Sequence, residues 1–155
     1  MSWPIGREAI LQMLDAGELE MAPPNRPFAD TLIGKAFKHL TTAEDIAATD
    51  PEIAFDALYT AARLALTAVL ATQGIRPTAK GGHIAPIAAV RAQTGRSGDA
   101  QLRPYDRLRR IRNRTDYPTP ESILTSEDVA EALPHAAAIV DVAAKLLPQL
   151  PVFVR

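Results

Sequence analysis

The most concentrated chemistry in the sequence is a run of arginines that ends at an acidic and aromatic turn, RLRRIRNRTDYP, from Arg107 to Pro118. Five arginines fall within eight residues of this run. Guanidinium groups bind phosphates and carboxylates through paired hydrogen bonds. The segment therefore indicates a solvated helix face, a surface that binds a nucleic-acid backbone, or part of an active site.

The charge of the chain is divided unevenly around this run. The whole chain has a formal net charge of -1, yet Arg103 to Arg114 holds six arginines and a single acid, Asp106. This segment carries +5, so the remainder carries -6. Such asymmetry favours an anionic partner on one face of the protein.

The arginines fall into two groups when a helix is drawn over residues 104–116. Leu108 and Ile111 mark the buried side, and one stripe of arginines points away from it. Arg112 instead lies beside the buried side, where an unpaired guanidinium is costly, and Asp116 is its natural partner four residues later. Arg112 is thus either half of a structural ion pair or a functional group. The candidates for binding nucleic acid are Arg107, Arg109, Arg110, Arg114 and Asp116.

The sequence around these residues predicts helices almost throughout. Alanine is abundant, β-branched runs are scarce, and Pro and Gly cluster between segments. The Ala-rich helix that Asp50 caps should lie at the centre, and Thr125 to Asp128 resembles a capping box. The predicted helices cover about 5–15, 28–49, 51–72, 84–93, 104–116 and 126–147. The segments 21–27, 75–83 and 94–99 are predicted to be a linker and two loops.

These elements predict an all-α, up-and-down bundle of four main helices plus one short helix. Residues 1–27 form an N-terminal helical appendage with a Pro-rich arm, 28–148 the bundle, and 149–155 an apolar tail that packs on the bundle or on a second subunit. No segment reaches the roughly 20 apolar residues that a bilayer requires. The chain has no cysteine. A cytoplasmic protein with no membrane contact is expected.

Catalytic motifs of other kinds are missing from the sequence. The three histidines (His39, His83 and His135) lack metal-ligand spacing, and no phosphate-loop or nucleophile-elbow motif occurs. Neither a metal nor a cofactor is expected. A helix-turn-helix reader of DNA is disfavoured, because Arg112 lies beside the core whereas a recognition helix points its reading residues outward.

The segment LRRIRNRTDYP resembles the signature of HEPN domains, which are bundles of four to five helices. Arg112-Asn113 matches the first half of the family motif, and Asp116-Tyr117 matches a variant second half found in bacterial relatives. The preceding segment DALYTAARLALTAVLATQGIRPTAKGGHIAPI and the last helix resemble the corresponding family helices. The resemblance covers about residues 31–147.

This resemblance implies an RNA- or nucleotide-binding module. It further implies an attenuated, metal-independent endoribonuclease, or the toxin of a toxin–antitoxin pair with an antitoxin-like nucleotidyltransferase partner. Family members usually dimerise so that two motifs face one cleft. By position, Arg112 would stabilise phosphate charge in the transition state and Asn113 would orient groups through hydrogen bonds.

Tyr117 occupies the place of the family's catalytic histidine. A tyrosine, with a pKa near ~10, is a poor proton acceptor at neutral pH, so catalysis is left open. Tyr59, Arg63 and His83 are further candidates for the same cleft. The alternative is a non-catalytic structural or interaction protein, in which Arg112–Asp116 is an ion pair that fixes the bundle.

Overall fold

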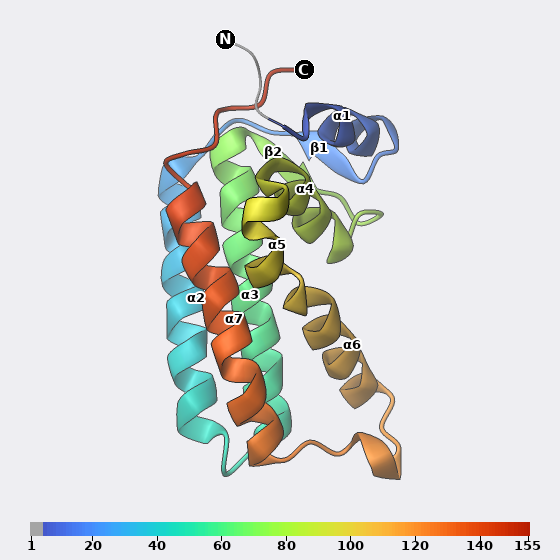
Figure 1. The fold of residues 1–155 in the computed structure, drawn as a ribbon, viewed down its shortest axis with the longest axis vertical. Helices are drawn as coiled ribbons and strands as arrows, with labels where there is room; N and C mark the ends of the chain where they lie inside the picture. Colours follow the sequence, from blue (N-terminus) through green and yellow to red (C-terminus); the bar gives the residue numbers. More distant parts are fainter. Residues whose placement is uncertain (1–4) are drawn as a thin grey trace.

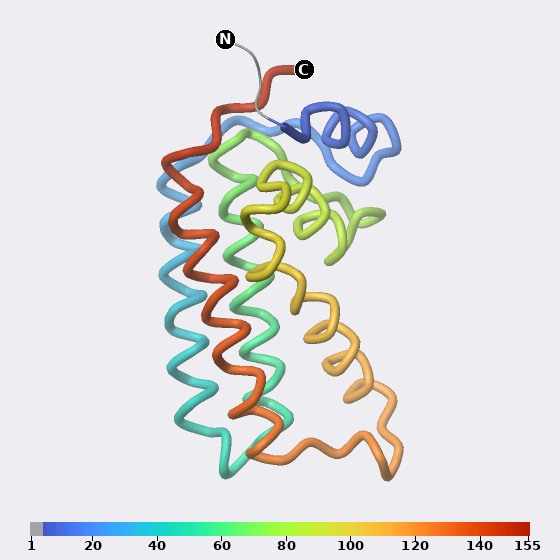
Figure 2. Tube along the Cα trace, viewed as in Figure 1, coloured from blue at the N-terminus to red at the C-terminus, as the bar shows by residue number. Residues whose placement is uncertain are grey.

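Three long helices run side by side along the molecule and enclose most of its core (Figure 1). They are α2 (Arg26–Ile46), α3 (Pro51–Gln73) and α7 (Ser126–Leu146). A fourth main helix, α6 (Pro104–Asp116), leans away from them before the chain returns to the start of α7 (Figure 2). This computed structural model describes residues 5–155 and confirms the predicted all-α bundle.

Helix α3 is central because its sequence is apolar on nearly every side. Most of its alanines and leucines are buried, and small side chains let α2 and α7 approach closely. Asp50 caps the helix by accepting a hydrogen bond from the Ile53 amide at 3.2 Å, and Gly74 ends it in the left-handed conformation. The predicted cap at Asp50 is confirmed.

Helix α2 begins two residues earlier than predicted. The side chain of Asn25 accepts a hydrogen bond from the Phe28 amide at 2.9 Å, so Asn25 is the N-cap and Pro27 belongs to the first turn. Proline suits this position because its missing N–H would have no partner there. At the other end of the bundle, the capping box of Thr125 and Asp128 is present as predicted.

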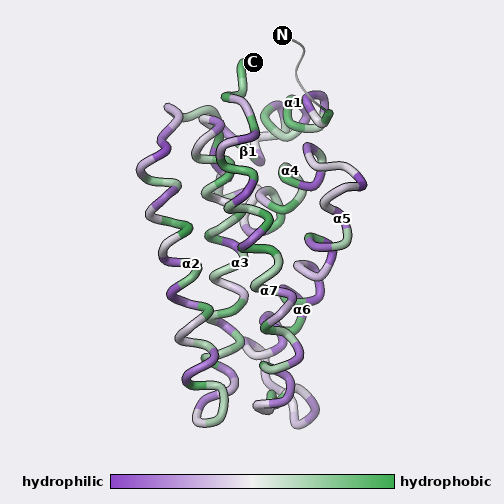
Figure 3. Tube along the Cα trace, turned by 60° about the vertical axis from the view of Figure 1, so that its left-hand side comes forward, coloured by the Kyte–Doolittle hydropathy of each residue, from purple (hydrophilic) through white to green (hydrophobic). Residues whose placement is uncertain are grey.

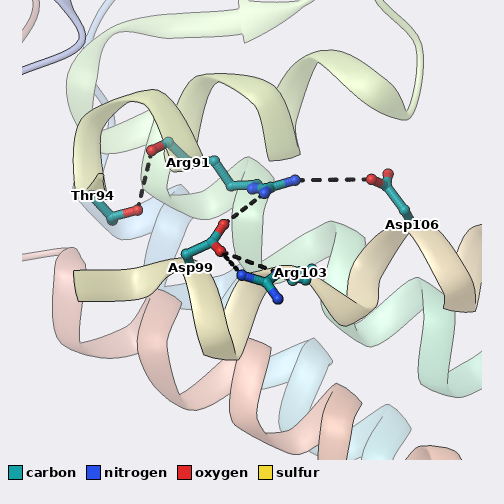
Figure 4. Close-up of polar contacts among 5 residues, drawn as sticks. All are labelled: Arg91, Thr94, Asp99, Arg103 and Asp106. Atoms are coloured by element: carbon teal, nitrogen blue, oxygen red, sulfur yellow. Dashed lines mark hydrogen bonds and ion pairs between the residues drawn. The ribbon is translucent and has the colours of Figure 1, made fainter. Parts of the chain in front are cut away.

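The segment TGRSGD was predicted to be a loop, and this was wrong. Residues Arg96–Leu102 form a short helix, α5, directly after α4 (Ile84–Thr94). Asp99 supports it by pairing with Arg103 and, at 2.6 Å, with Arg91 of α4 (Figure 4). Arg91 also lies 3.9 Å from Asp106 of α6, so these charges link three consecutive helices.

A two-stranded sheet was also missed by the sequence interpretation. Strand β1 (Leu19–Met21) pairs antiparallel with β2 (Ile75–Pro77), inside the stretch predicted to be a loop. A strand of three residues is too short to show the alternation of apolar and polar side chains by which strands are recognised in a sequence. The pairing joins α1 (Arg7–Asp15) and β1 to the end of α3. Residues 1–4 of the predicted appendage lie outside the described residues.

The C-terminal tail packs on its own bundle, which is one of the two arrangements expected. Phe153 is buried, and its amide donates a hydrogen bond to the Gln73 carbonyl oxygen at 2.8 Å. The Arg7 guanidinium stacks over the Phe153 ring and donates to the Val154 carbonyl oxygen at 2.6 Å. The tail and α1 therefore hold each other at one end of the molecule (Figure 1).

Hydrophobic and hydrophilic stretches alternate along the long helices (Figure 3), as expected for helices that each bury one face. Among the described residues, α3 is the one helix long and apolar enough to cross a membrane. Most of its apolar window is buried inside the protein, which is typical of a core helix.

Candidate functional site

Polar side chains form two facing stripes where α6 crosses α3. Asp56, Tyr59 and Arg63 follow one another on one face of α3 at spacings of three and four residues. The facing stripe on α6 has the same helical spacing, and His83 lies beside both helices at the start of α4. We call this group the α3–α6 cluster. Its members are Asp56, Tyr59, Arg63, His83, Tyr105, Arg109, Arg112 and Asp116.

Arg112 is held by carboxylates from both helices. Its Nε donates to Asp56 Oδ1 at 2.9 Å, and its Nη1 donates to Asp116 Oδ2 at 3.0 Å. The hydrogen bond with Asp56 stabilises the charged form and raises the pKa of Arg112. The guanidinium also lies 5.8 Å from the centre of the Tyr59 ring, within the range of a cation–π contact. Arg112 is therefore fixed in place and fully charged.

Two buried tyrosines connect this arginine to His83. Tyr59 Oη lies 2.8 Å from His83 Nδ1 and 3.1 Å from Tyr105 Oη. Tyr105 Oη donates to the backbone carbonyl oxygen of His83 at 3.0 Å. Burial raises the pKa of both tyrosines, so both keep their protons at neutral pH. The histidine is thus held at its ring and at its backbone, while the residue remains exposed.

Arg63 and Arg109 stand out because part of each guanidinium has lost water without gaining a partner. The Nε of each is buried and makes no hydrogen bond within residues 5–155. Buried N–H groups in proteins are nearly always paired, so two orphans at one place are unusual. Each guanidinium also carries two terminal nitrogens, through which arginine binds phosphates and carboxylates.

The charges of these arginines act on His83. Burial lowers the pKa of His83, and the positive charge of Arg63 lowers it further. Arg112 and Arg109 act in the same direction with smaller effects. The imidazole is consequently neutral at physiological pH, and the cluster concentrates positive charge beside it.

All residues of the α3–α6 cluster fall within a known family domain. The family model of the HEPN domain matches residues 29–147, which is most of the chain and includes every residue of the cluster. The chain belongs to the HEPN domain family. Searches of curated proteins and of solved structures found no significant match.

The outward stripe of the HEPN domain lies on a different side of α6. Arg107, Arg110 and Arg114 line a cavity of about 520 Å³ between α6 and α7, and Arg107 also pairs with Glu131 at 3.3 Å. Asn113 is exposed beside this stripe rather than in the α3–α6 cluster. The structure thus separates Arg109, which joins the cluster, from the three arginines with which it was grouped by sequence.

Tyr117 lies just beyond α6, as the residue that caps the helix C-terminus. Its side chain is 84% exposed and makes no hydrogen bond or ring contact within residues 5–155. By contrast, the other three cleft candidates (Tyr59, Arg63 and His83) all belong to the cluster. A role for Tyr117 or Asn113 remains a prediction.

Two residues of the cluster were missed by sequence reasoning as site residues. Asp56 lies one helical turn before Tyr59, so helical spacing is the signal that could have found it on the same face of α3. Tyr105 lies one and two helical turns from Arg109 and Arg112 on α6, so helical spacing is the signal that could have found it. Their importance follows from contacts between residues far apart in the chain. Within the described residues, no group of three or more His, Asp or Glu side chains could hold a metal ion.

Proposed function

We propose that this HEPN domain binds RNA, and that the α3–α6 cluster holds a phosphate of the RNA backbone. The observation that carries the proposal is the positive charge of Arg63 and Arg109, which form no ion pair within residues 5–155 and act together on His83. A phosphate oxygen is a strong acceptor and would neutralise the charge that burial makes unfavourable. Arg112, already tied to Asp56 and Asp116, would add a third positive charge.

The arrangement of arginines on α6 favours a polymer over a free nucleotide. The cluster occupies one side of the helix, and the stripe of Arg107, Arg110 and Arg114 occupies another. A strand that crosses α6 would therefore meet positive charge on both sides of the helix. Phosphate contacts of this kind release counterions, so the affinity should fall steeply as salt rises.

The test is to measure the binding of fluorescent single-stranded RNA by anisotropy at several salt concentrations. Arg63→Gln and Arg109→Gln should each weaken binding and flatten the salt dependence by about 0.7 in the log–log slope per lost phosphate contact. Arg26→Gln is the matched control, because Arg26 is an exposed α2 residue that pairs with Asp30 and carries the same charge. Equal affinities for all four proteins would refute the proposal.

A structural role for Arg112 is the second candidate, and its two ion pairs favour it. Under this reading, Arg112→Gln lowers the melting temperature and leaves RNA affinity unchanged. Under the RNA-binding proposal, the same variant also loses affinity. Measuring both quantities on one protein preparation separates the two roles.

Family membership also motivates three further predictions. The protein would be a metal-independent endoribonuclease, it would form a homodimer in which two motifs face each other, and it would act as a toxin with a nucleotidyltransferase antitoxin. The exposed Asp116-Tyr117 end of α6 and the outward arginines are the surfaces that a second copy would have to face. Sedimentation of the purified chain, with and without Arg114→Glu, measures whether α6 takes part in self-association.

A further inference from the structure

The three contacts among Tyr59, Tyr105 and His83 fix where the protons lie. Each tyrosine hydroxyl has a single proton to donate. Tyr105 donates its proton to the His83 carbonyl oxygen at 3.0 Å, so in the 3.1 Å contact between the hydroxyls Tyr59 must be the donor. Tyr59 then has no proton left for His83. The 2.8 Å contact between Tyr59 Oη and His83 Nδ1 therefore requires a proton on Nδ1.

The opposite order of donors leaves one contact without a proton. If Tyr105 donated to Tyr59 and Tyr59 donated to Nδ1, the Tyr105 hydroxyl oxygen and the His83 carbonyl oxygen would face each other at 3.0 Å with only lone pairs between them. Tyr105 is completely buried, so water cannot relieve this repulsion. The first order satisfies all three contacts and sets neutral His83 in the tautomer with Nδ1 protonated.

This tautomer gives His83 a free lone pair on Nε2. Within residues 5–155, Nε2 has no hydrogen-bond partner, and the residue as a whole is exposed. The charged groups that face His83 are Arg63 from α3 and Arg109 and Arg112 from α6, and all three disfavour an imidazolium. The free nitrogen thus belongs to an imidazole that feels the charge of the same guanidinium groups to which the proposed function assigns an RNA phosphate.

We propose that His83 Nε2 is a general base that removes the proton from a ribose 2′-hydroxyl of RNA bound at the α3–α6 cluster. This inference rests on the proposed function, because the RNA must be held there first. It assigns the base to the segment before α4, whereas the family resemblance places it at Tyr117 at the end of α6. Tyr59 and Tyr105 are positioning residues that fix the tautomer.

The step needs neither a metal nor a redox partner. The 2′-hydroxyl proton moves to Nε2, and the 2′-oxygen forms a bond to the adjacent phosphorus with its electron pair. The bond from phosphorus to the 5′-oxygen breaks, and the 5′-oxygen takes a proton from water. The resulting hydroxide accepts the proton from the imidazolium, which restores neutral His83. The products are a 2′,3′-cyclic phosphate and a 5′-hydroxyl. Arg63, Arg109 and Arg112 would stabilise the charge that builds on the phosphate oxygens.

The experiment incubates the full chain with a mixed-sequence single-stranded RNA pool in the presence of EDTA, beside a matched pool with 2′-O-methyl riboses. The variants are His83→Asn, Tyr59→Phe and, as the matched control, His39→Asn in α2. We expect the wild type and His39→Asn to cleave RNA and leave the methylated pool intact. His83→Asn should lose about 10²-fold or more of the cleavage rate while retaining RNA affinity.

Nitrogen NMR of His83 tests the positioning role directly. In the wild type, neutral His83 should carry its proton on Nδ1, and in Tyr59→Phe it should shift towards the Nε2-protonated form, with slower cleavage. A wild type that binds RNA without cleaving it, or a His83→Asn variant that cleaves normally, would overturn the inference and leave the proposed RNA binding intact. If Arg63→Gln and Arg109→Gln instead bound RNA as tightly as the wild type, the proposed function would be refuted.

Discussion

At the scale of single residues, the cluster is defined by charges that lack their usual compensation. Arg112 has two carboxylate partners, whereas Arg63 and Arg109 each bury an N–H without an acceptor. The positive charge of Arg63 and Arg109 acts on His83 by disfavouring its protonated form. The arginines would thus serve both an anionic ligand and the neutrality of the histidine.

Removing one of these charges should raise the pKa of His83. In Arg63→Gln the imidazolium is no longer repelled by Arg63, so the protonated form persists to higher pH than in the wild type. Titration of the His83 ring protons by NMR in the free protein measures this directly. If Nε2 is the base, the acidic limb of the cleavage–pH profile should move to higher pH as well, because activity requires the unprotonated ring.

Arg26→Gln is the control for this titration, because it removes the same charge from an ion pair on α2. The pKa of His83 should be unchanged in this variant. An unchanged pKa in Arg63→Gln too would show that burial alone lowers the pKa of His83, and that Arg63 does not act on the cluster.

At the scale of elements, the segment between β2 and α4 determines where His83 lies. Thr78 donates its amide to the Glu18 carbonyl oxygen at 3.1 Å, and Lys80 Nζ donates to the Ala16 carbonyl oxygen at 2.6 Å. Gly81 then passes so close to Glu18 that a Cβ atom would overlap its carbonyl group. The turn after α1 therefore supports the backbone that presents His83 to Tyr59.

Gly81→Ala should displace this segment and weaken the contact between His83 and Tyr59. The added methyl group meets backbone rather than a flexible side chain, so the segment must move as a unit. We expect a destabilisation of about 1–3 kcal/mol from overpacking, together with loss of the Nδ1-protonated tautomer. Chemical denaturation and nitrogen NMR measure the two effects.

Gly34→Ala is the matched substitution in α2, where an added Cβ meets nothing within 4 Å. It should stabilise the protein by about 0.5–1 kcal/mol, because alanine loses less backbone entropy in a helix than glycine does. If Gly81→Ala behaved like Gly34→Ala, the close approach to Glu18 would not control the position of His83.

At the scale of the whole molecule, the N-terminal elements belong to the scaffold of the site, although the family match begins at residue 29. Ile10, Leu14 and Leu19 are buried, and β1 pairs with β2 immediately before the segment that carries His83. Arg7 also holds the C-terminal tail through Val154. The ends of the chain thus stabilise one end of the bundle.

Deletion of residues 1–21 should therefore lower the melting temperature and impair the site. Burial of a large aliphatic side chain stabilises a protein by about 1.5–3 kcal/mol, and the deletion removes three such residues. RNA affinity should fall less than cleavage, because Arg63, Arg109 and Arg112 lie on α3 and α6, which the deletion leaves intact. A truncated protein with wild-type melting temperature and cleavage would show that these elements are dispensable.

Much of this protein follows from local sequence signals. Asp50 and Gly74 bound α3, the capping box at Thr125 starts α7, and helical spacing placed Arg112 beside the core with Asp116 as its partner. Such signals act within one or two helical turns, where the backbone geometry is already known. The sequence alone therefore determined the helical class, most helix boundaries and the separate position of Arg112.

Which of these residues form one site became clear from the folded structure. The short helix α5 and the pairing of β1 with β2 depend on partners elsewhere in the chain, such as Asp99 with Arg91 and Glu20 with Arg76. The same is true of the cluster, where His83 meets Tyr59 across 24 residues and Arg112 meets Asp56 across 56. Contacts at such separations are set by how the helices pack, and no local pattern records that packing.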